Sequence, residues 1–489
     1  MKKILLSASL LMLSTAAFAV TDGQTYEVKD GLTCENLWII DRLHNGTEYT
    51  KYEMSGTTSP SAVTDGKYIY VATTTRTINA TEGLGACIEV FDFMTGAYVK
   101  TIDLKNADGT NFTAYMGANS FGIDEYGHFW VGSLKVNGDG GAGNAEVNIV
   151  NMETGIVTSV GELPFDMNGG RIDYYDVLGD LTGVESGASI LASASNTNLN
   201  IFYWRLEKGG TEWIGGWDGS YAQEVDATYP ADFTEFSTSQ IKCIRQMEED
   251  GVLGMFYVDG FNTLPTLYNN DGSMSENNFG NVDVIKYDEE NNPISGEIPE
   301  PTTGTVGVGD GSIMGQNMLI YSLEQGDSEA GKPAYYAHKY RSVLTIVDAD
   351  FSFSSMKYLW TIPADGFGGE TSARRISCYN FIEGEPDANG KQCGYLFIYK
   401  ECNGMAVYRI AEEGYGSVEE NFVANANITV NGDVIAVSET AESIEVYNVA
   451  GQKVAQVENA SEIAAPATGL YIVKAVVEGA PVVKKVIVK

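Results

Sequence analysis

The sequence predicts an all-β protein, with a β-propeller of six blades, or seven, followed by a small C-terminal β-sandwich. Three observations predict this fold. From residue 20 to 423, strand-like runs alternate with Gly, Asn and Asp turns, and no segment has a convincing amphipathic-helix pattern. Two separate pairs of segments in this region match at almost the same offset. The final segment, 424–489, differs sharply in charge from the rest.

The two matching pairs define a repeated unit. Residues 63–71 match residues 123–131 at an offset of 60, and residues 88–96 match residues 147–155 at an offset of 59. A four-stranded unit of about 50–60 residues, repeated about six times, is typical of a β-propeller. Weaker copies of the second motif, an apolar alternation ending in Asp or Asn, follow at 199–204, 282–288, 344–348 and 405–410.

One further copy of this motif, at residues 38–46, lies near the N-terminus with no inner hairpin before it. We expect it to complete the last blade and close the ring, which removes the exposed sheet edges. A count of seven blades is an alternative, because the gap between residues 204 and 282 is long. The alternatives are a stack of β-sandwiches or a β-helix, although a β-helix needs a shorter period.

The N-terminus has the three parts of a secretory signal. Lys2 and Lys3 precede a short apolar run at residues 4–13, and Ala17-Phe18-Ala19 supplies the small-x-small cleavage pattern. We therefore expect residues 1–19 to be a signal peptide and the mature chain to begin at Val20. The apolar run is too short to span a bilayer stably, and no later stretch is long enough for a transmembrane segment.

The C-terminal segment is predicted to be a separate module. Residues 424–489 hold 5 basic and 7 acidic residues, whereas residues 20–423 hold 23 basic and 59 acidic residues. This shift places a boundary between a propeller body at 20–423 and a module at 424–489. Short β-branched runs predict strands in the module at 427–430, 434–437, 443–448, 469–476 and 482–488.

Three runs of this module, 444–454, 469–474 and 484–489, occur in order at the end of the chain. They resemble the type A sorting domain of type IX secretion, a small β-sandwich of proteins that cross the outer membrane of Bacteroidota-type bacteria. The resemblance implies recognition by the translocon, proteolytic removal, and display on the cell surface or release. It lacks the family's Pro-Asn-Pro at the start, and the alternative is a structural sandwich without a sorting role. The matching motif residues are Tyr447, Gly451, Gly469, Tyr471 and Lys489.

Composition excludes one class of partner. Lys and Arg total 30 and Asp and Glu total 66, which gives a net charge of −36. A polyanion of this kind is repelled by phosphate backbones, so nucleic-acid binding is not expected.

Candidate ligand-binding residues come from three polar clusters. The cluster at 335–341 contains a histidine and is dense in aromatic residues, the cluster at 369–375 holds an Arg pair that would suit a carboxylate, and the cluster at 169–175 precedes an inner hairpin. Each has a structural alternative, as an ordinary strand or as ion pairs that fix a blade. The candidates are Arg171, Tyr174, His338, Arg341, Arg374 and Arg375.

No catalytic residue and no metal site is predicted. The three histidines have no partner at zinc-ligand spacing, the Gly-rich runs open no helix, and Ca²⁺ is compatible with the acidic composition without a place for it. Of the six cysteines, a pair among Cys378, Cys393 and Cys402 is the best disulfide candidate, with buried free thiols as the alternative. Trp204, Trp213 and Trp217 are expected in the core rather than stacked on sugars.

The leading hypothesis is therefore a secreted, surface-displayed propeller that binds a glycan, peptide or protein without catalysis. The second is an extracellular polysaccharide hydrolase or lyase with a site at the channel mouth, which rests on fold analogy alone. A structural surface-layer component is the third. Three or more convergent carboxylate, Tyr or Arg groups at the channel mouth would favour the enzyme, and a channel plugged by apolar side chains would favour the binder or scaffold.

Overall fold

The structure is a computed structural model of the chain, which divides into two compact units, Met1–Glu413 and Gly414–Lys489. Among the residues described, no helix is long and apolar enough to cross a membrane. The described residues are 20–45, 61–79, 83–112, 118–133, 135–136, 142–166, 171–195, 201–215, 241–249, 252–260, 266–269, 307–326, 338–349, 356–368, 377–401, 403–416, 428–448, 452–477 and 480–488.

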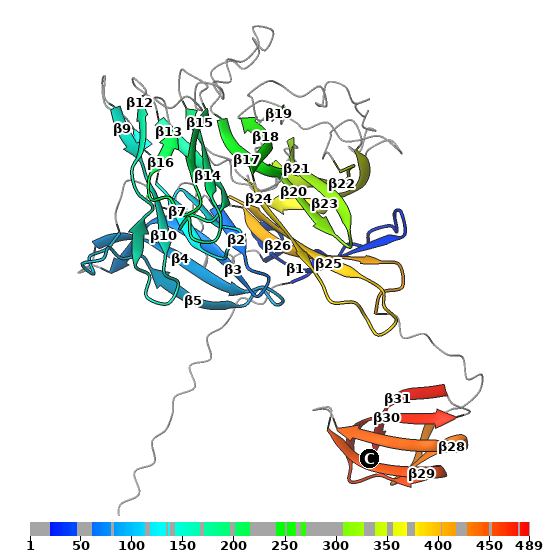
Figure 1. Cartoon of the computed structure of the whole chain (residues 1–489). Coiled ribbons are helices and arrows are strands. Elements are labelled where there is room, and N and C mark those ends of the chain that lie inside the picture. Colours follow the sequence, from blue (N-terminus) through cyan, green and yellow to red (C-terminus); the bar gives the residue numbers. More distant parts are fainter. Residues whose placement is uncertain are drawn as a thin grey trace, which may run out of the picture. The chain divides into compact units, whose positions relative to one another are not determined.

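The described residues of the first unit form six antiparallel sheets of three or more strands, numbered here 1 to 6 (Figure 1). Sheet 1 contains β2 (Ser61–Thr64), β3 (Tyr68–Asn79), β4 (Gly83–Asp92) and β5 (Tyr98–Asp103). Sheet 2 contains β6 (Ser120–Ile123), β7 (Phe129–Gly132), β10 (Val147–Val150) and β11 (Val157–Ser159). Sheet 3 contains β13 (Arg171–Gly179), β14 (Ala188–Ser195), β15 (Ile201–Leu206) and β16 (Trp213–Gly215), with the short β8 (Lys135–Val136) beside β13.

The remaining sheets follow the same plan. Sheet 4 contains β17 (Ile241–Glu249), β18 (Val252–Gly260) and β19 (Thr266–Asn269). Sheet 5 contains β20 (Val308–Ile313), β21 (Gln316–Gly326), β22 (His338–Ile346) and β23 (Lys357–Gly368). Sheet 6 contains β24 (Ser377–Glu383), β25 (Cys393–Lys400), β26 (Gly404–Glu412) and β1 (Leu32–Asp41). A separate two-stranded ribbon pairs β9 (Ala142–Ala145) with β12 (Leu163–Asp166).

The first strands of the six sheets form a closed ring. In the order β2, β6, β13, β17, β20 and β24, each contacts the next, and β24 contacts β2. Since β17 contacts both β13 and β20, these three are neighbours among the strands that the structure describes, which gives a ring of six. The unit is a six-bladed β-propeller, and these six are its inner strands.

The ring is closed by the first strand of the chain. β1 runs antiparallel to β26, from the pair Leu32 and Glu412 to the pair Asp41 and Gly404, and forms the outermost strand of sheet 6 (Figure 1). This is the closing role that the sequence predicts for residues 38–46, although the strand spans Leu32–Asp41 and the short α1 (Arg42–Asn45) follows it.

The segments that match in sequence occupy the same places in sheets 1 and 2. Residues 63–71 and 123–131 cover the first two strands of their sheets, and residues 88–96 and 147–155 cover the third strand and the turn after it. Equivalent strand positions are what a 59- or 60-residue offset requires of successive blades.

The turns after the third strands show why Asp and Asn recur there. Asp92 Oδ1 accepts a 2.9 Å hydrogen bond from the backbone N–H of Thr95, and Asn151 Oδ1 accepts one of 3.0 Å from that of Thr154. Each turn then ends on a glycine with positive φ, Gly96 or Gly155. Both side chains thus substitute for a backbone acceptor in a tight turn.

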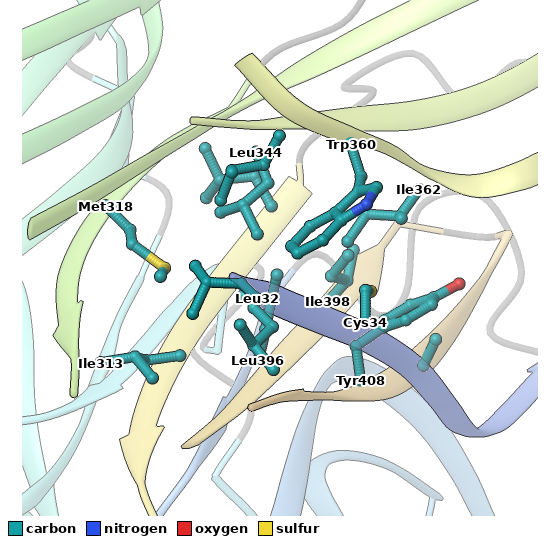
Figure 2. Close-up of a cluster of buried hydrophobic side chains, with 14 of the residues drawn as sticks. Leu32, Cys34, Ile313, Met318, Leu344, Trp360, Ile362, Leu396, Ile398 and Tyr408 are labelled. Atoms are coloured by element: carbon teal, nitrogen blue, oxygen red, sulfur yellow. The ribbon is translucent and has the colours of Figure 1, made fainter. Parts of the chain in front are cut away.

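The hydrophobic core lies between neighbouring sheets. Figure 2 shows the cluster between sheets 5 and 6, where Met318 and Leu344 lie near Leu396 and Ile398. Leu32 of β1 lies in the same cluster. Because each sheet buries side chains against its neighbours, the N-terminal strand contributes core as well as hydrogen bonds to the last blade.

Sheets 5 and 6 approach each other closely along a run of glycines. Gly309 and Gly311 alternate along β20, and Gly307 directly precedes the strand, so this side of sheet 5 carries no side chain at three alternate positions. A β-carbon on Gly309 would lie 2.8 Å from the β-carbon of Tyr379, and one on Gly311 would overlap the ring of Phe381. Side chains of β24 therefore pack directly on the backbone of β20.

The second unit is a small β-sandwich built from one sheet. The sheet order is β27-β28-β30-β31, with β29 on β28, and the end strands β27 and β31 contact each other across one apolar cluster. Its strands are β27 (Ile428–Asn431), β28 (Val434–Asn448), β29 (Lys453–Ala464), β30 (Gly469–Val477) and β31 (Ala480–Val488).

Two details of this unit differ from the sequence prediction. The predicted strands 434–437 and 443–448 are one strand, β28, whose pairing with β29 is irregular between Ala436 and Ala441. β29 was not predicted, because it is largely exposed and lacks an apolar alternation. In the body, the predicted segment 282–288 lies outside the described residues.

Candidate functional site

A cavity of about 100 Å³ lies where the inner strands meet. Its lining comes from β2, β6, β13, β20 and β24, so five of the six sheets contribute inner-strand residues. Trp130 of β7 also reaches it, over Gly122. The cavity is therefore part of the central channel of the propeller, and concave sites of this kind are where proteins hold small ligands.

Serines at the starts of three inner strands connect neighbouring sheets around this cavity. Ser61 Oγ donates a 3.1 Å hydrogen bond to the carbonyl of Phe121. Ser120 Oγ accepts one of 3.0 Å from the N–H of Tyr175. Ser377 Oγ accepts one of 2.7 Å from Ser322. A small hydroxyl satisfies backbone and side-chain groups without filling the channel, so the lining is held in place by the blades themselves.

Tyr379 contributes a further cross-sheet contact. Its hydroxyl lies 2.9 Å from Ser322 Oγ and 3.0 Å from Ser342 Oγ, both on sheet 5. The glycines of β20 make room for this ring, since a side chain at Gly309 would collide with it. The hydroxyl is thus directed into sheet 5.

The ionisable groups that line the cavity are few. The one carboxylate among the described lining residues is Asp176, which is 8% exposed. Cys378 also lines the cavity, and burial raises the pKa of its thiol even though hydrogen bonds with the Ala62 backbone and the Ser61 side chain lower it. A thiol with a raised pKa is protonated at neutral pH and is a poor nucleophile.

A cluster of possible metal ligands lies in the turns after the inner strands of sheets 2 and 3. His128 Nδ1 is 2.9 Å from Asp124 Oδ2 and 3.4 Å from Asp180 Oδ1. The carboxylate oxygens also accept hydrogen bonds, from Leu181 N–H at 3.0 Å and from Thr182 N–H at 2.8 Å. Because the ligand atoms are already engaged, this arrangement fits a connection between two sheets better than a metal site.

Electrostatics agree with that assignment. Burial alone would raise the pKa of Asp180, but hydrogen bonds from the Thr182 side chain and from backbone N–H groups, together with the nearby His128, lower it. Asp180 is therefore held as a carboxylate in the turn.

A second buried polar network joins the N-terminal segment to the closing strands. Asp22, 6% exposed, accepts hydrogen bonds from Tyr26 at 2.7 Å and from Tyr408 at 3.0 Å. Burial and the charge of Asp22 raise the pKa of both tyrosines, so they remain donors. Asp22 N–H in turn donates to Asn36 Oδ1 at 2.9 Å. The first residues of the described chain are thus anchored to β1 and β26.

Of the residues proposed as ligand-binding from the sequence, Tyr174 lines the cavity. Arg171 begins the inner strand β13, whereas His338 and Arg341 lie on β22, the third strand of sheet 5. Arg374 and Arg375 lie outside the described residues.

The sequence prediction missed several lining residues, among them Ser61, Trp130 and Ser377. One signal in the sequence could have identified Ser61. Ser61 and Ser120 are 59 residues apart, which matches the offset of the repeated segments and indicates equivalent positions in two blades. Trp204 and Trp213 are buried, as the core interpretation predicts, and Trp217 lies outside the described residues.

The predicted disulfide is wrong for the cysteines described. Cys378 and Cys393 are both free thiols. Cys378 pairs across the strands with Tyr399, at the other end of β25 from Cys393, so the two sulfur atoms are not opposite each other. Cys402 lies outside the described residues.

The sorting-motif residues divide between core and surface. Tyr471 is 8% exposed and its hydroxyl donates to the carbonyl of Ala467 at 3.1 Å. Tyr447 lies on the other face of the sheet and donates to Glu445 Oε2 at 2.7 Å, while Lys453 donates to Glu445 Oε1 at 2.9 Å. Gly469 begins β30 with φ 158. Gly451 and Lys489 lie outside the described residues.

The second unit matches a known family. The sequence model described as a secretion system C-terminal sorting domain matches residues 424–489. The chain therefore ends in a type IX sorting domain, and the protein is exported to the cell surface or the extracellular space. No curated protein matches the chain.

Solved structures resemble it only distantly. A DUF4623 family protein from Bacteroides eggerthii has a TM-score of 0.44 at 11% identity, covering 80% of this chain and 77% of its own. The Trypanosoma rangeli sialidase has a TM-score of 0.34 at 9% identity, covering 88% and 84%. The WD40 domain of SCAP from fission yeast has a TM-score of 0.30 at 10% identity, covering 85% and 96%. At these scores the likeness does not bear on function.

Proposed function

We propose that the protein is a surface-displayed propeller that binds part of a ligand in its central cavity without changing it covalently. The observation that carries this proposal is the cavity itself, which inner strands of five sheets line. Hydrogen bonds between sheets hold its polar walls, as the contacts of Ser61 and Ser377 show. A preformed polar cavity on a rigid ring favours binding, because little conformational entropy is lost when a ligand enters.

The described lining supports binding over two kinds of catalysis, hydrolysis by a carboxyl pair and attack by a thiolate. Glycoside hydrolysis commonly uses two carboxyl groups, about 5–9.5 Å apart. The described lining residues include one, Asp176. Covalent catalysis by a thiol needs a thiolate, and burial keeps Cys378 protonated. The described lining residues therefore offer hydrogen-bonding groups, Tyr174 and Tyr175 among them, and a single carboxyl group.

Export to the surface sets the class of ligand. A protein exported by the type IX route meets glycans, peptides and proteins of the surroundings rather than cytoplasmic metabolites. The net charge of −36 works against polyanions. We propose a neutral glycan, with a peptide or protein ligand as the alternative.

The test is binding and turnover measured on the same sample. The purified mature chain is applied to an array of neutral and acidic polysaccharides, and each bound glycan is then incubated with excess protein and analysed for shortened or unsaturated products. We expect binding without products, and weaker binding by Ser377→Ala than by the exposed control Ser312→Ala. Product formation that Asp176→Asn abolishes would instead establish a hydrolase or lyase.

A further inference from the structure

The indole N–H of Trp130 is a buried hydrogen-bond donor. Trp130 is 4% exposed, and among the described residues no acceptor lies within hydrogen-bonding distance of its Nε1. Buried N–H groups in folded proteins almost always have a partner, either in the protein or in a bound molecule. An acceptor that does not belong to the described chain is therefore expected at this nitrogen.

The position of the ring directs this N–H to the cavity. Trp130 on β7 lies opposite Gly122 on β6, and its ring folds over that glycine towards the channel. The indole nitrogen lies 2.9 Å from the place that a β-carbon of Gly122 would occupy. Both residues line the cavity, so the missing side chain at Gly122 is what lets the donor reach it.

Two other lining groups complete a hydrogen-bonding set. Ser377 Oγ accepts from Ser322, which leaves the proton of Ser377 able to donate to a ligand. Ser61 donates to the carbonyl of Phe121 and has the Cys378 thiol 3.9 Å from its Oγ, which leaves one lone pair of that oxygen as an acceptor. The walls thus offer two donors and an acceptor, and a hydroxyl group is the simplest ligand group that can both accept and donate.

We propose that the cavity binds a hydroxylated arm whose oxygen accepts the hydrogen bond from Trp130 Nε1. This rests on the proposed binding function and names its chemistry. The cavity of about 100 Å³ is smaller than the ~150 Å³ cavity that holds a benzene ring, so it takes only a few non-hydrogen atoms. Such an arm belongs either to a free polyol or to a sugar residue at the end of a neutral glycan.

The experiment follows the indole N–H signals of the ¹⁵N-labelled mature chain by NMR. Glycerol and erythritol are titrated as free polyols, and neutral oligosaccharides as glycans. Trp130→Phe removes the donor and keeps an aromatic ring. Trp213→Phe is the matched control, because Trp213 is also buried but its Nε1 already donates to the carbonyl of Val160 at 3.0 Å.

We expect the Trp130 signal to move on titration, and Trp130→Phe to weaken binding about tenfold while the protein stays folded. Trp213→Phe should bind normally. A response to oligosaccharides identifies a glycan arm, and a response to the small polyols alone identifies a free polyol. Glycan binding on the array with an unmoved Trp130 signal would overturn this assignment and leave the binding function intact. Absence of all binding would overturn both.

Discussion

The indole nitrogen of Trp38 donates a 2.8 Å hydrogen bond to the carbonyl oxygen of Phe93. Trp38 belongs to β1, the outermost strand of sheet 6, and Phe93 follows the third strand of sheet 1. Both are almost fully buried, and they share a core cluster with Phe397 and Tyr399 of sheet 6. The bond therefore crosses the junction at which the ring closes, between the first and last sheets.

Replacing Trp38 tests how much this junction stabilises the ring. Trp38→Phe removes the indole N–H, so the carbonyl of Phe93 loses this hydrogen bond, and the smaller ring opens space in the core. We expect a loss of about 1–3 kcal/mol in the free energy of unfolding, measured by urea denaturation. The control is Val99→Ala on the exposed side of sheet 1, where Val99 is 45% exposed. Equal stability of the two variants would show that the junction does not depend on this bond.

The glycines of β20 give a second test of packing. Gly309→Ala places a β-carbon 2.8 Å from that of Tyr379, so sheets 5 and 6 must separate or rearrange. We expect a loss of roughly 1–3 kcal/mol from overpacking, measured by the same denaturation. Ser312→Ala on the same strand is the control, because Ser312 is exposed. A Gly309→Ala variant as stable as this control would contradict the close contact described.

Much of the propeller could be predicted because its signals are local. The turns at Asp92 and Asn151 repeat with the period of the blades, and each one is specified by a side chain that accepts from its own backbone. The closing strand β1 could be found for the same reason, since it carries the same apolar alternation. Strand β29 lacked such a pattern and was missed.

The cavity could be predicted only in part because its lining depends on which strands become neighbours. Tyr174 was found from a polar cluster before an inner strand. Trp130 was not, because its role depends on Gly122 in the adjacent strand. The cysteines failed for a related reason: nearness in sequence placed Cys378 and Cys393 in one sheet but not opposite each other.

His44 gives a prediction of pH dependence. Its Nδ1 lies 2.9 Å from Asp41 Oδ1, and Asp22 and Asp365 add negative charge nearby. Burial opposes protonation, but the hydrogen bond and charges of these carboxylates prevail and raise the pKa of His44. A raised pKa means that the folded state binds the proton more tightly than the unfolded state. The stabilisation is therefore complete below about pH 6.5, the ordinary value, and is lost as pH rises through the folded-state pKa.

The measurement compares the wild type with His44→Gln by urea denaturation at pH 5.5 and pH 9. We expect the wild type to be more stable by on the order of 1 kcal/mol at pH 5.5, with a smaller difference at pH 9. Both proteins carry the same other carboxylates, so the difference between their unfolding free energies cancels the pH dependence that those carboxylates cause. A difference that does not change, or that grows with pH, would exclude a stabilising charged His44.

The sorting domain gives the last prediction, which separates export from folding. Deletion of residues 424–489 removes strands β27 to β31 of the second unit but none of the strands β1 to β26. We expect the shortened protein to fold and to stay in the periplasm, assayed by cell fractionation and by surface accessibility to protease. Shortened protein at the cell surface would show that export does not need this domain.

Two tyrosine variants refine this test because one residue is buried and the other lies on the surface. Tyr471→Ala removes a side chain that is 8% exposed, and we expect a loss of about 3–5 kcal/mol that unfolds the domain and stops export. Tyr447→Ala removes a surface ring bonded to Glu445, so the domain should remain folded. If Tyr447 belongs to the face that the translocon recognises, its variant loses export while its circular dichroism spectrum is unchanged. Normal export of Tyr447→Ala would show that the translocon does not need this ring, and the motif would then be explained by the folding of the domain's core.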